Sequence, residues 1–187
     1  CNFKRADFLK YLPADLVEYM KHITNLNRDR NTQILQQAQE LNGLLLANNI
    51  RPIFLKGTGN ILEGLYEDIG ERMIGDIDFL FSEEDYPKAI TILREFGYSE
   101  VGTYKYYIPE KRHYRRLQKE NNIAAIEIHK ELLIEKYAIE FNYSFVEKDS
   151  QVIKGVRVLS YANKLNLSII ANQINDSGFY YKTMALR

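Results

Sequence analysis

Hydrophobic residues in the N-terminal part of the chain recur with the spacing of an α-helix. The pattern predicts a helix over residues 13–24, where Pro13 fits the first turn. A longer helix is expected from about residue 28 to residue 47, with apolar side chains on one stripe and Gln and Glu opposite. Asn48 and Asn49 are expected to end it. These helices would cover one side of a sheet or form a small N-terminal cap.

The middle of the chain alternates short apolar segments with helical ones. In chain order, the expected elements are a strand at 52–56, a glycine turn at 57–59, a helix at 60–66, a strand at 76–82, a helix at about 82–97 and a strand near 98–101. Pro87 falls in the first turn of the second of these helices, where its missing N–H costs little, and Gly97 closes that helix.

The second half of the chain predicts two hairpins and one further helix. Asn121-Asn122 is a two-residue turn that leads into a strand at 123–129, and residues 130–141 form an amphipathic helix or an irregular crossover. Residues 151–159 predict a short hairpin that turns at Lys154-Gly155. Ser160 then caps a helix.

These elements predict an α/β (α+β) fold with a mixed β-sheet flanked by helices. The expected segments are an N-terminal helical segment at 1–50, an α/β core at 51–146, and a C-terminal hairpin and helix at 147–187. There is no internal repeat and no Pro/Ser-rich linker, so the chain shows no sharp domain boundary.

Composition narrows the possible partners. The chain has 187 residues, is 45% hydrophobic and 27% charged, and carries a formal net charge of +0. Because it has no global positive field, small-molecule partners are favoured over nucleic acid. Its apolar runs are too short to cross a bilayer and no signal-peptide pattern is present, so a cytoplasmic protein without a membrane partner is expected.

The single cysteine, Cys1, excludes an internal disulfide and fits a reducing compartment. An N-terminal cysteine is also the lipidated residue of a mature lipoprotein, but here a charged helical region follows at once. A trimmed chain is the simpler expectation.

Two carboxylates interrupt the apolar strand expected at 76–82. Side chains alternate along a strand, so Ile77 and Phe79 point one way while Asp76 and Asp78 point the other. Acids two residues apart in a strand lie roughly 6.5–7 Å apart at Cα, which allows both to reach one divalent cation or a pair of them. Without such a partner the two charges would repel each other and cost free energy, so the pattern indicates a metal or another cationic partner.

A third acid, Glu127, lies in the strand expected at 123–129 and shares a face with His129. A turn centred on Asn121-Asn122 pairs Arg116 with Glu127, and Tyr114 with His129. The alternative is a plain cross-strand ion pair, worth a few tenths of a kcal/mol to about 1 kcal/mol. A histidine at a strand end is usually structural, and neither His129 nor His113 is assigned a catalytic step.

The segment around Lys56, Gly57 and Thr58 follows a strand and precedes a helix. That arrangement directs backbone N–H groups, and here a lysine, toward an anion such as phosphate. The alternative is a simple tight turn. The segment 103–120 mixes tyrosines with Lys and Arg, which suits phosphates and bases, but an exposed strand with long charged side chains would look the same.

Taken together, these motifs resemble the DNA polymerase beta-type nucleotidyltransferase superfamily. More narrowly, the chain is similar to the bacterial uncharacterised nucleotidyltransferases that carry Lys-Gly in place of the commoner Gly-Ser. The resemblance covers roughly residues 50–130. It rests on Leu55-Lys56-Gly57, on Arg72 followed by Gly75-Asp76-Ile77-Asp78-Phe79-Leu80, on the end of the helix at Gly97-Tyr98, and on Ile126-Glu127-Ile128-His129.

The resemblance implies transfer of a nucleoside monophosphate from an NTP to an acceptor hydroxyl, assisted by Mg²⁺ or Mn²⁺. It implies that Asp76 and Asp78 bind metal and that Glu127 completes the metal site or acts as general base. The nucleotide-binding residues it implies are Lys56, Gly57, Thr58, Arg72 and Arg116. The chain has Lys56-Gly57-Thr58 where a Gly-Ser pair is usual, which makes the phosphate contacts less certain than the metal ligands. The acceptor is open, with a small molecule favoured over protein or RNA.

Two other classes of protein fit the motifs. An Asp-x-Asp pair also serves Mn²⁺-dependent glycosyltransferases, although those usually open with a strand rather than with helices. A non-catalytic nucleotide-binding module is the second alternative, and the intact carboxylates argue against it.

Overall fold

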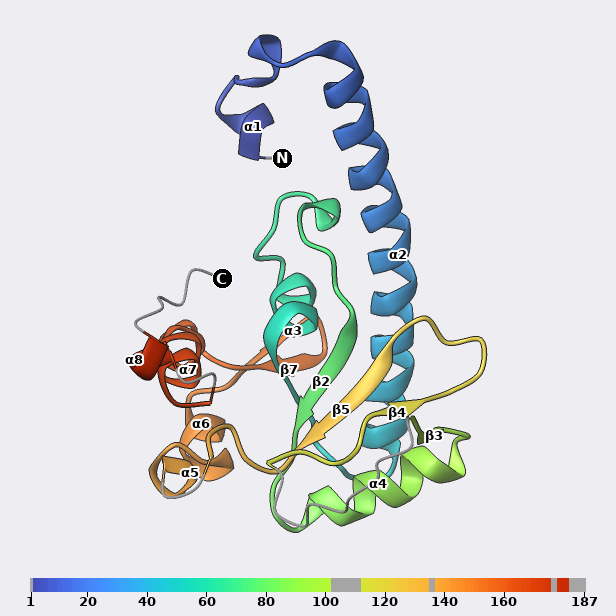
Figure 1. Ribbon diagram of the computed structural model, residues 1–187. Helices are drawn as coiled ribbons and strands as arrows, with labels where there is room; N and C mark the ends of the chain where they lie inside the picture. Colours follow the sequence, from blue (N-terminus) through green and yellow to red (C-terminus); the bar gives the residue numbers. More distant parts are fainter. Residues whose placement is uncertain (1, 102–111, 135–136, 176–177, 182–187) are drawn as a thin grey trace.

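The computed structural model describes residues 2–101, 112–134, 137–175 and 178–181 of the chain. Within these residues a seven-stranded mixed sheet is flanked by helices (Figure 1). The expected α/β fold class is therefore confirmed. In the segment 103–120, which mixes tyrosines with basic residues, positions up to 111 lie outside the described residues.

The sheet joins strands from most of the chain. The strands are β1 (Ile53–Phe54), β2 (Asp76–Leu80), β3 (Ser99–Glu100), β4 (Leu117–Gln118), β5 (Ala125–His129), β6 (Gln151–Ile153) and β7 (Val156–Val158). Their order across the sheet is β3-β4-β5-β2-β1-β7-β6. The β2–β5 and β1–β7 pairs are parallel, and the other pairs are antiparallel. The C-terminal hairpin thus extends the same sheet through β7.

Helices lie on both sides of this sheet. They are α1 (Asn2–Arg5), α2 (Ala14–Ala47), α3 (Lys56–Glu63), α4 (Asp85–Glu95), α5 (Tyr137–Glu140), α6 (Tyr143–Lys148), α7 (Tyr161–Ile174) and α8 (Gly178–Tyr181), with short 3₁₀ turns η1 (Leu9–Tyr11) and η2 (Ile69–Glu71). None of these described helices contains an apolar stretch that could cross a membrane.

Helix α2 is one continuous helix of 34 residues, so the prediction of two helices was wrong. No Gly or Pro stands between residues 24 and 28, and nothing there breaks the chain of i to i−4 hydrogen bonds. Its buried residues begin only at Asn31, because the C-terminal half covers the sheet while the N-terminal half extends beyond it (Figure 1). As expected, the helix ends before Asn48, and Asn49 has a left-handed φ of 60°.

The core has two parts, one on each face of the sheet. The larger part joins α2 and α4 to one face and includes Ile34, Leu41, Phe54, Ile77, Phe79, Phe81, Ile126 and Ile128. The smaller part lies on the opposite face near the C-terminal helices and includes Ile53, Leu55, Leu80, Leu132, Phe141, Val146 and Leu159. Strand β2 contributes to both, since its residues alternate between the two faces.

Helix α3 begins earlier than predicted. The residues expected to form a glycine turn, 57–59, lie inside the helix, which starts at Lys56. Gly59 is needed there because a Cβ atom would lie 2.8 Å from the carbonyl oxygen of Phe54 in β1. A side chain at this position would push α3 away from the sheet.

The β4–β5 hairpin agrees with the predicted register in part. Leu117 pairs with Ile126, as expected, but His113 rather than Tyr114 lies opposite His129. The chain therefore accommodates one extra residue between these two points, as a β-bulge does. The turn is also displaced by one residue, because the Asn122 N–H donates to the Lys119 carbonyl at 3.1 Å.

Several other local predictions are confirmed. The predicted helix after β2 is α4, and the expected strand near 98–101 follows it as β3; at the start of α4 the Asp85 N–H donates to the Ser82 hydroxyl. The Ser160 hydroxyl accepts one from the Asn163 N–H in α7. The β6–β7 hairpin turns through Lys154 and Gly155, with left-handed φ values of 52° and 82°. Residues 130–134 form an irregular crossover toward α5.

Candidate active site

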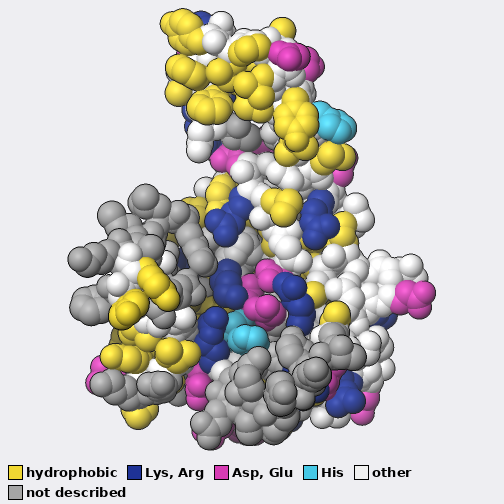
Figure 2. Space-filling model, in the orientation of Figure 1, with side chains coloured by type: hydrophobic (Ala, Val, Ile, Leu, Met, Phe, Trp, Pro, Cys, Tyr) yellow, Lys and Arg dark blue, Asp and Glu magenta, His cyan; other side chains and the backbone are white. Residues whose placement is uncertain are grey.

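The three acids predicted from the sequence lie on two adjacent parallel strands. Strands β2 and β5 pair with Asp76 opposite Ala125 and with Asp78 opposite Glu127. All three carboxylates therefore point to the same face of the sheet, away from the apolar core under α2. Figure 2 shows acidic side chains gathered at the middle of the molecule, between Lys and Arg side chains and beside a histidine.

Asp78 lies at the centre of this group, and its side chain is 1% exposed. Its Oδ1 atom forms an ion pair with the Lys56 ammonium and lies 2.9 Å from His129 Nε2. Two groups that carry or can carry a positive charge thus converge on one carboxylate oxygen. A carboxylate this deeply buried needs such partners, because an unpaired charge would cost several kcal/mol.

Glu127 shares both partners of Asp78. Its Oε2 atom lies 3.4 Å from Lys56 Nζ and 3.7 Å from His129 Nε2. The side chain is 19% exposed, so one side of the carboxylate remains open. Strand pairing brings these groups together, since Glu127 lies opposite Asp78 and His129 opposite Leu80.

Asp76 is the most open of the three acids, and it pairs with Arg116. The distance from Arg116 Nη2 to Asp76 Oδ2 is 2.7 Å, whereas Arg116 Nε lies 3.7 Å from Glu127 Oε1. The predicted neighbourhood of Arg116 and Glu127 is therefore present. The stronger contact of the arginine, however, is with Asp76.

The charges of the site shift the pKa values of its members. Burial, together with the negative charges of Asp78 and Glu127, raises the pKa of Asp76 above its ordinary value. The interaction with His129 lowers the pKa of Glu127 well below its ordinary value; burial opposes this effect and the charge of Lys56 adds to it. Burial lowers the pKa of Lys56, but the hydrogen bond and charge of Asp78, together with the charges of Glu127 and Asp76, outweigh that effect and leave the pKa raised.

The predicted phosphate-binding residues lie beside the acids. Lys56 has a left-handed backbone, with φ of 49°, where β1 passes into α3. A non-glycine residue held in this region costs of order 1–3 kcal/mol, and such strain concentrates at functional sites. A Cβ on Gly57 would lie 3.5 Å from Arg72 Nε, so Arg72 reaches the first turn of α3. Thr58 is fully buried, and its hydroxyl donates to the Asp76 carbonyl at 2.7 Å, so this side chain supports β2 rather than facing the open side of the site.

His129 was not among the residues predicted to form the site. Its place on the same face as Glu127 was evident from strand alternation, but its contact with Asp78 depends on the pairing of β2 with β5. Its side chain is 1% exposed, and its ring lies 5.2 Å from the ring of His113, centre to centre. Burial lowers the pKa of His113.

The donor atoms suit a divalent cation. In the described part of the chain, Asp78, Glu127 and His129 each offer one ligand atom, and these atoms lie within 4.8 Å of one another. Carboxylate oxygen and imidazole nitrogen are common ligands of divalent metals in proteins. Asp76 lies on the same face and could supply a further oxygen.

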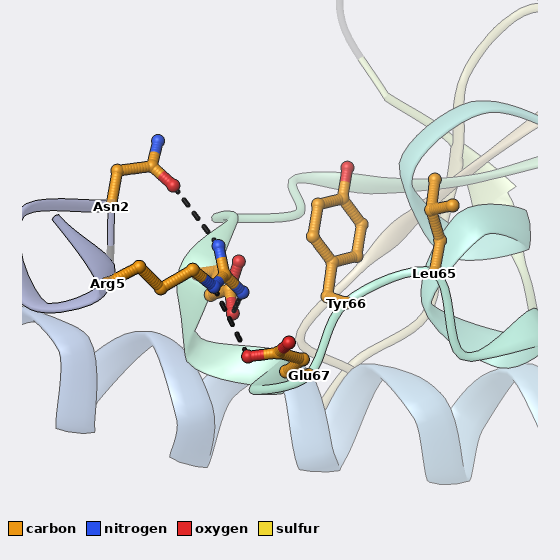
Figure 3. Close-up of a pocket in the computed structure, with 6 residues that line it drawn as sticks. Asn2, Arg5, Leu65, Tyr66 and Glu67 are labelled. Atoms are coloured by element: carbon orange, nitrogen blue, oxygen red, sulfur yellow. Dashed lines mark hydrogen bonds and ion pairs between the residues drawn. The ribbon is translucent and has the colours of Figure 1, made fainter.

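A separate cavity of about 510 Å³ lies near the N-terminal segment. It is lined by Asn2, Arg5, Leu65, Tyr66, Glu67 and Glu71 (Figure 3). Arg5 forms ion pairs there with Glu67 and Glu71, which link α1 to the loop before β2. This cavity contains none of the strand acids.

Three carboxylates on neighbouring strands of a mixed sheet, with a lysine at a strand-to-helix junction and arginines alongside, form the arrangement that the resemblance to nucleotidyltransferases implies. The chain belongs to the family described as uncharacterised nucleotidyltransferase, whose sequence profile matches residues 1–179. No curated protein matches the chain.

The fold is similar to that of a putative nucleotidyltransferase from Thermotoga maritima, known from a crystal structure. The TM-score is 0.55 at 14% sequence identity, and the match covers 81% of this chain and 92% of the other. At this level of identity the likeness supports the fold alone.

Proposed function

We propose that this protein is a metal-dependent nucleotidyltransferase that moves a nucleoside monophosphate from an NTP to an acceptor hydroxyl. The observation that carries the proposal is the meeting of Asp76, Asp78 and Glu127 on one face of β2 and β5, in a chain of a nucleotidyltransferase family. Mg²⁺ or Mn²⁺ held by these residues would polarise the transferred phosphate and neutralise charge on the departing one.

In the proposed reaction, the acceptor oxygen forms a bond to the α-phosphorus of the NTP. The bond from that phosphorus to the oxygen bridging to the β-phosphate breaks, and pyrophosphate leaves with the electron pair. Glu127 has one of two roles: it completes the metal site, or it takes the proton of the acceptor hydroxyl while Asp76 and Asp78 hold the metal. Its side chain is 19% exposed at the open side of the acidic group.

The basic residues around the acids would bind the phosphates. Arg116 already contacts Asp76 at 2.7 Å, so its guanidinium lies where charge develops during transfer. Lys56 and Arg72 flank the first turn of α3, where Gly57 leaves the backbone open to an anion. Lys56 is held by Asp78 and Glu127, and we propose that it turns to the phosphates when a metal takes its place.

The acceptor is assigned only by class. The formal net charge of +0 gives no general attraction for a nucleic acid, so a small molecule is favoured over RNA or protein. A cytoplasmic location stays a prediction.

Calorimetry of NTP binding with and without Mg²⁺ tests the proposal. We expect the double variant Asp76→Asn, Asp78→Asn to lose Mg²⁺-dependent NTP binding by at least about a hundredfold, because both carboxylate charges are gone. The control is Glu120→Gln, which removes an exposed carboxylate from the turn after β4. Unchanged metal-dependent binding in the double variant would overturn the proposal.

A transfer assay then addresses the acceptor. The protein is incubated with α-labelled NTPs and a cell extract separated into small-molecule, RNA and protein fractions. With the native protein, a labelled product distinct from the NTP and its hydrolysis products is expected in the small-molecule fraction, and this product should be absent with the double variant. Label in the RNA or protein fraction would support nucleotidyl transfer but would exclude a small molecule as the acceptor.

A further inference from the structure

We propose that His129 is a metal ligand and that its imidazole makes the site select Mn²⁺ and Co²⁺ over Mg²⁺. The inference rests on the proposed function and deepens it, because it names the class of metal that the acids bind. It starts from the observation that the Nε2 atom of a fully buried histidine, 1% exposed, is directed at two of the three carboxylates.

The geometry allows one cation to share these three groups. His129 Nε2 lies 2.9 Å from Asp78 Oδ1 and 3.7 Å from Glu127 Oε2. A cation with bonds of about 2.0–2.3 Å holds neighbouring ligand atoms roughly 3–3.5 Å apart. Small side-chain movements would therefore place all three atoms around one ion. The Lys56 ammonium now contacts the same two carboxylate oxygens, so a cation is already favoured at this position.

Among the described residues, His129 makes its polar contacts through Nε2 alone. Its Nδ1 atom has no hydrogen-bond partner among the described residues, so the ring is not held by a bond on its far side. The neighbouring ring of His113, 5.2 Å away, is instead anchored through Nδ1 to the Tyr114 carbonyl at 2.9 Å. Burying a histidine with one free nitrogen costs free energy, which the interaction of Nε2 with the acids or with a metal offsets.

The chemistry of the ligand set decides which metal is favoured. Mg²⁺ binds oxygen ligands and keeps much of its water, whereas imidazole nitrogen favours first-row transition metals. Along that series affinity rises from Mn²⁺ to Co²⁺. Replacing one oxygen ligand of an acidic site by His129 therefore weakens Mg²⁺ relative to both. We expect Mn²⁺ to bind roughly tenfold or more tightly than Mg²⁺.

Pulsed electron paramagnetic resonance of the Mn²⁺-loaded native protein tests the ligand directly. We expect modulation from a coordinated ¹⁴N nucleus, changing to a ¹⁵N pattern when the protein is labelled with ¹⁵N-histidine. The control variant His113→Gln removes the adjacent ring and is expected to leave the signal unchanged. This measurement requires neither activity nor a variant of His129 itself.

The selectivity is tested by titrating His129→Gln with Mn²⁺, Co²⁺ and Mg²⁺. The glutamine amide can still donate to Asp78 but lacks the imidazole nitrogen, so the preference for Mn²⁺ over Mg²⁺ should fall about tenfold or more. Circular dichroism tests whether the variant is folded. If it is not folded, the resonance experiment on the native protein tests whether His129 is a metal ligand.

Each result separates this inference from the proposed function. Mn²⁺ binding without a nitrogen signal, while metal-dependent NTP binding persists, would overturn the role of His129 and leave the proposed function intact. Failure of the native protein to bind any of the three cations, with or without an NTP, would overturn both.

Discussion

The two faces of strands β2 and β5 differ in what their residues contribute. The face under α2 and α4 carries Ile77, Phe79, Ile126 and Ile128, all fully buried. The opposite face carries Asp76, Asp78, Glu127 and His129. The same two strands thus supply the larger hydrophobic core on one side, and on the other side they place the acids and His129 next to Leu80 of the smaller core.

The core face contributes to folding stability, and the acid face carries the groups of the candidate active site. Each fully buried apolar side chain on the core face contributes about 1.5–3 kcal/mol to folding. On the other face, burial and the charges of Asp78 and Glu127 raise the pKa of Asp76, so the negative charge of Asp76 opposes folding even though Arg116 contacts it. Side chains alternate between the two faces of a strand. The apolar residues on the core face can therefore stabilise a strand whose other face carries charged residues.

The largest expected effect comes from the core face. Phe79→Ala removes a side chain that packs against the rings of Phe54 and Phe81, with ring centres 4.7 and 5.8 Å away. We expect the free energy of unfolding to fall by about 3–5 kcal/mol, measured by urea denaturation. Tyr19→Ala, on the exposed part of α2, should change it by less than about 0.5 kcal/mol. A similar loss in both variants would contradict the assignment of the core.

A smaller effect is expected where α3 packs against β1. Gly59→Ala places a Cβ 2.8 Å from the Phe54 carbonyl oxygen, so the backbone must shift, and we expect a loss of about 1–3 kcal/mol. Gly43→Ala in α2 is the matched control, because no atom lies within 4 Å of its added Cβ. There alanine should stabilise the helix by roughly 0.5–1 kcal/mol. Thermal or urea unfolding of the two variants gives opposite signs if the close contact is real.

Much of this arrangement could be predicted because it follows from local patterns. Strand alternation placed Asp76 and Asp78 on one face and Ile77 on the other before any contact was known. The cap at Ser160 likewise depends only on neighbouring residues.

The features that were missed depend on contacts between distant parts of the chain. The contact of His129 with Asp78 follows from the parallel pairing of β5 with β2, which no local signal specifies. The bulge that brings His113 opposite His129 shifts the register within a hairpin that otherwise fits the prediction. Helix α2 runs on past residue 24 because no residue there breaks it, although nothing in the local pattern required continuation.

The smallest expected effect is a gain on the acid face. Lys56 forms an ion pair with Asp78 and lies 3.4 Å from Glu127, so its ammonium competes with a metal for the same oxygens. We expect Lys56→Met to raise the affinity for Mn²⁺ in the absence of NTP by about tenfold, or about 1.4 kcal/mol, because the internal cation is gone. Calorimetric titration with Mn²⁺ measures the change.

The same variant should bind NTP more weakly, since the lysine can no longer reach the phosphates. If Lys56 competes with the metal, the Mn²⁺ affinity rises while the NTP affinity falls. General damage to the fold would lower both affinities. Lys88→Met, an exposed lysine paired with Glu84 on α4, is the control and should change neither affinity. Loss of Mn²⁺ affinity in Lys56→Met would show that the lysine organises the carboxylates for the metal rather than competing with it.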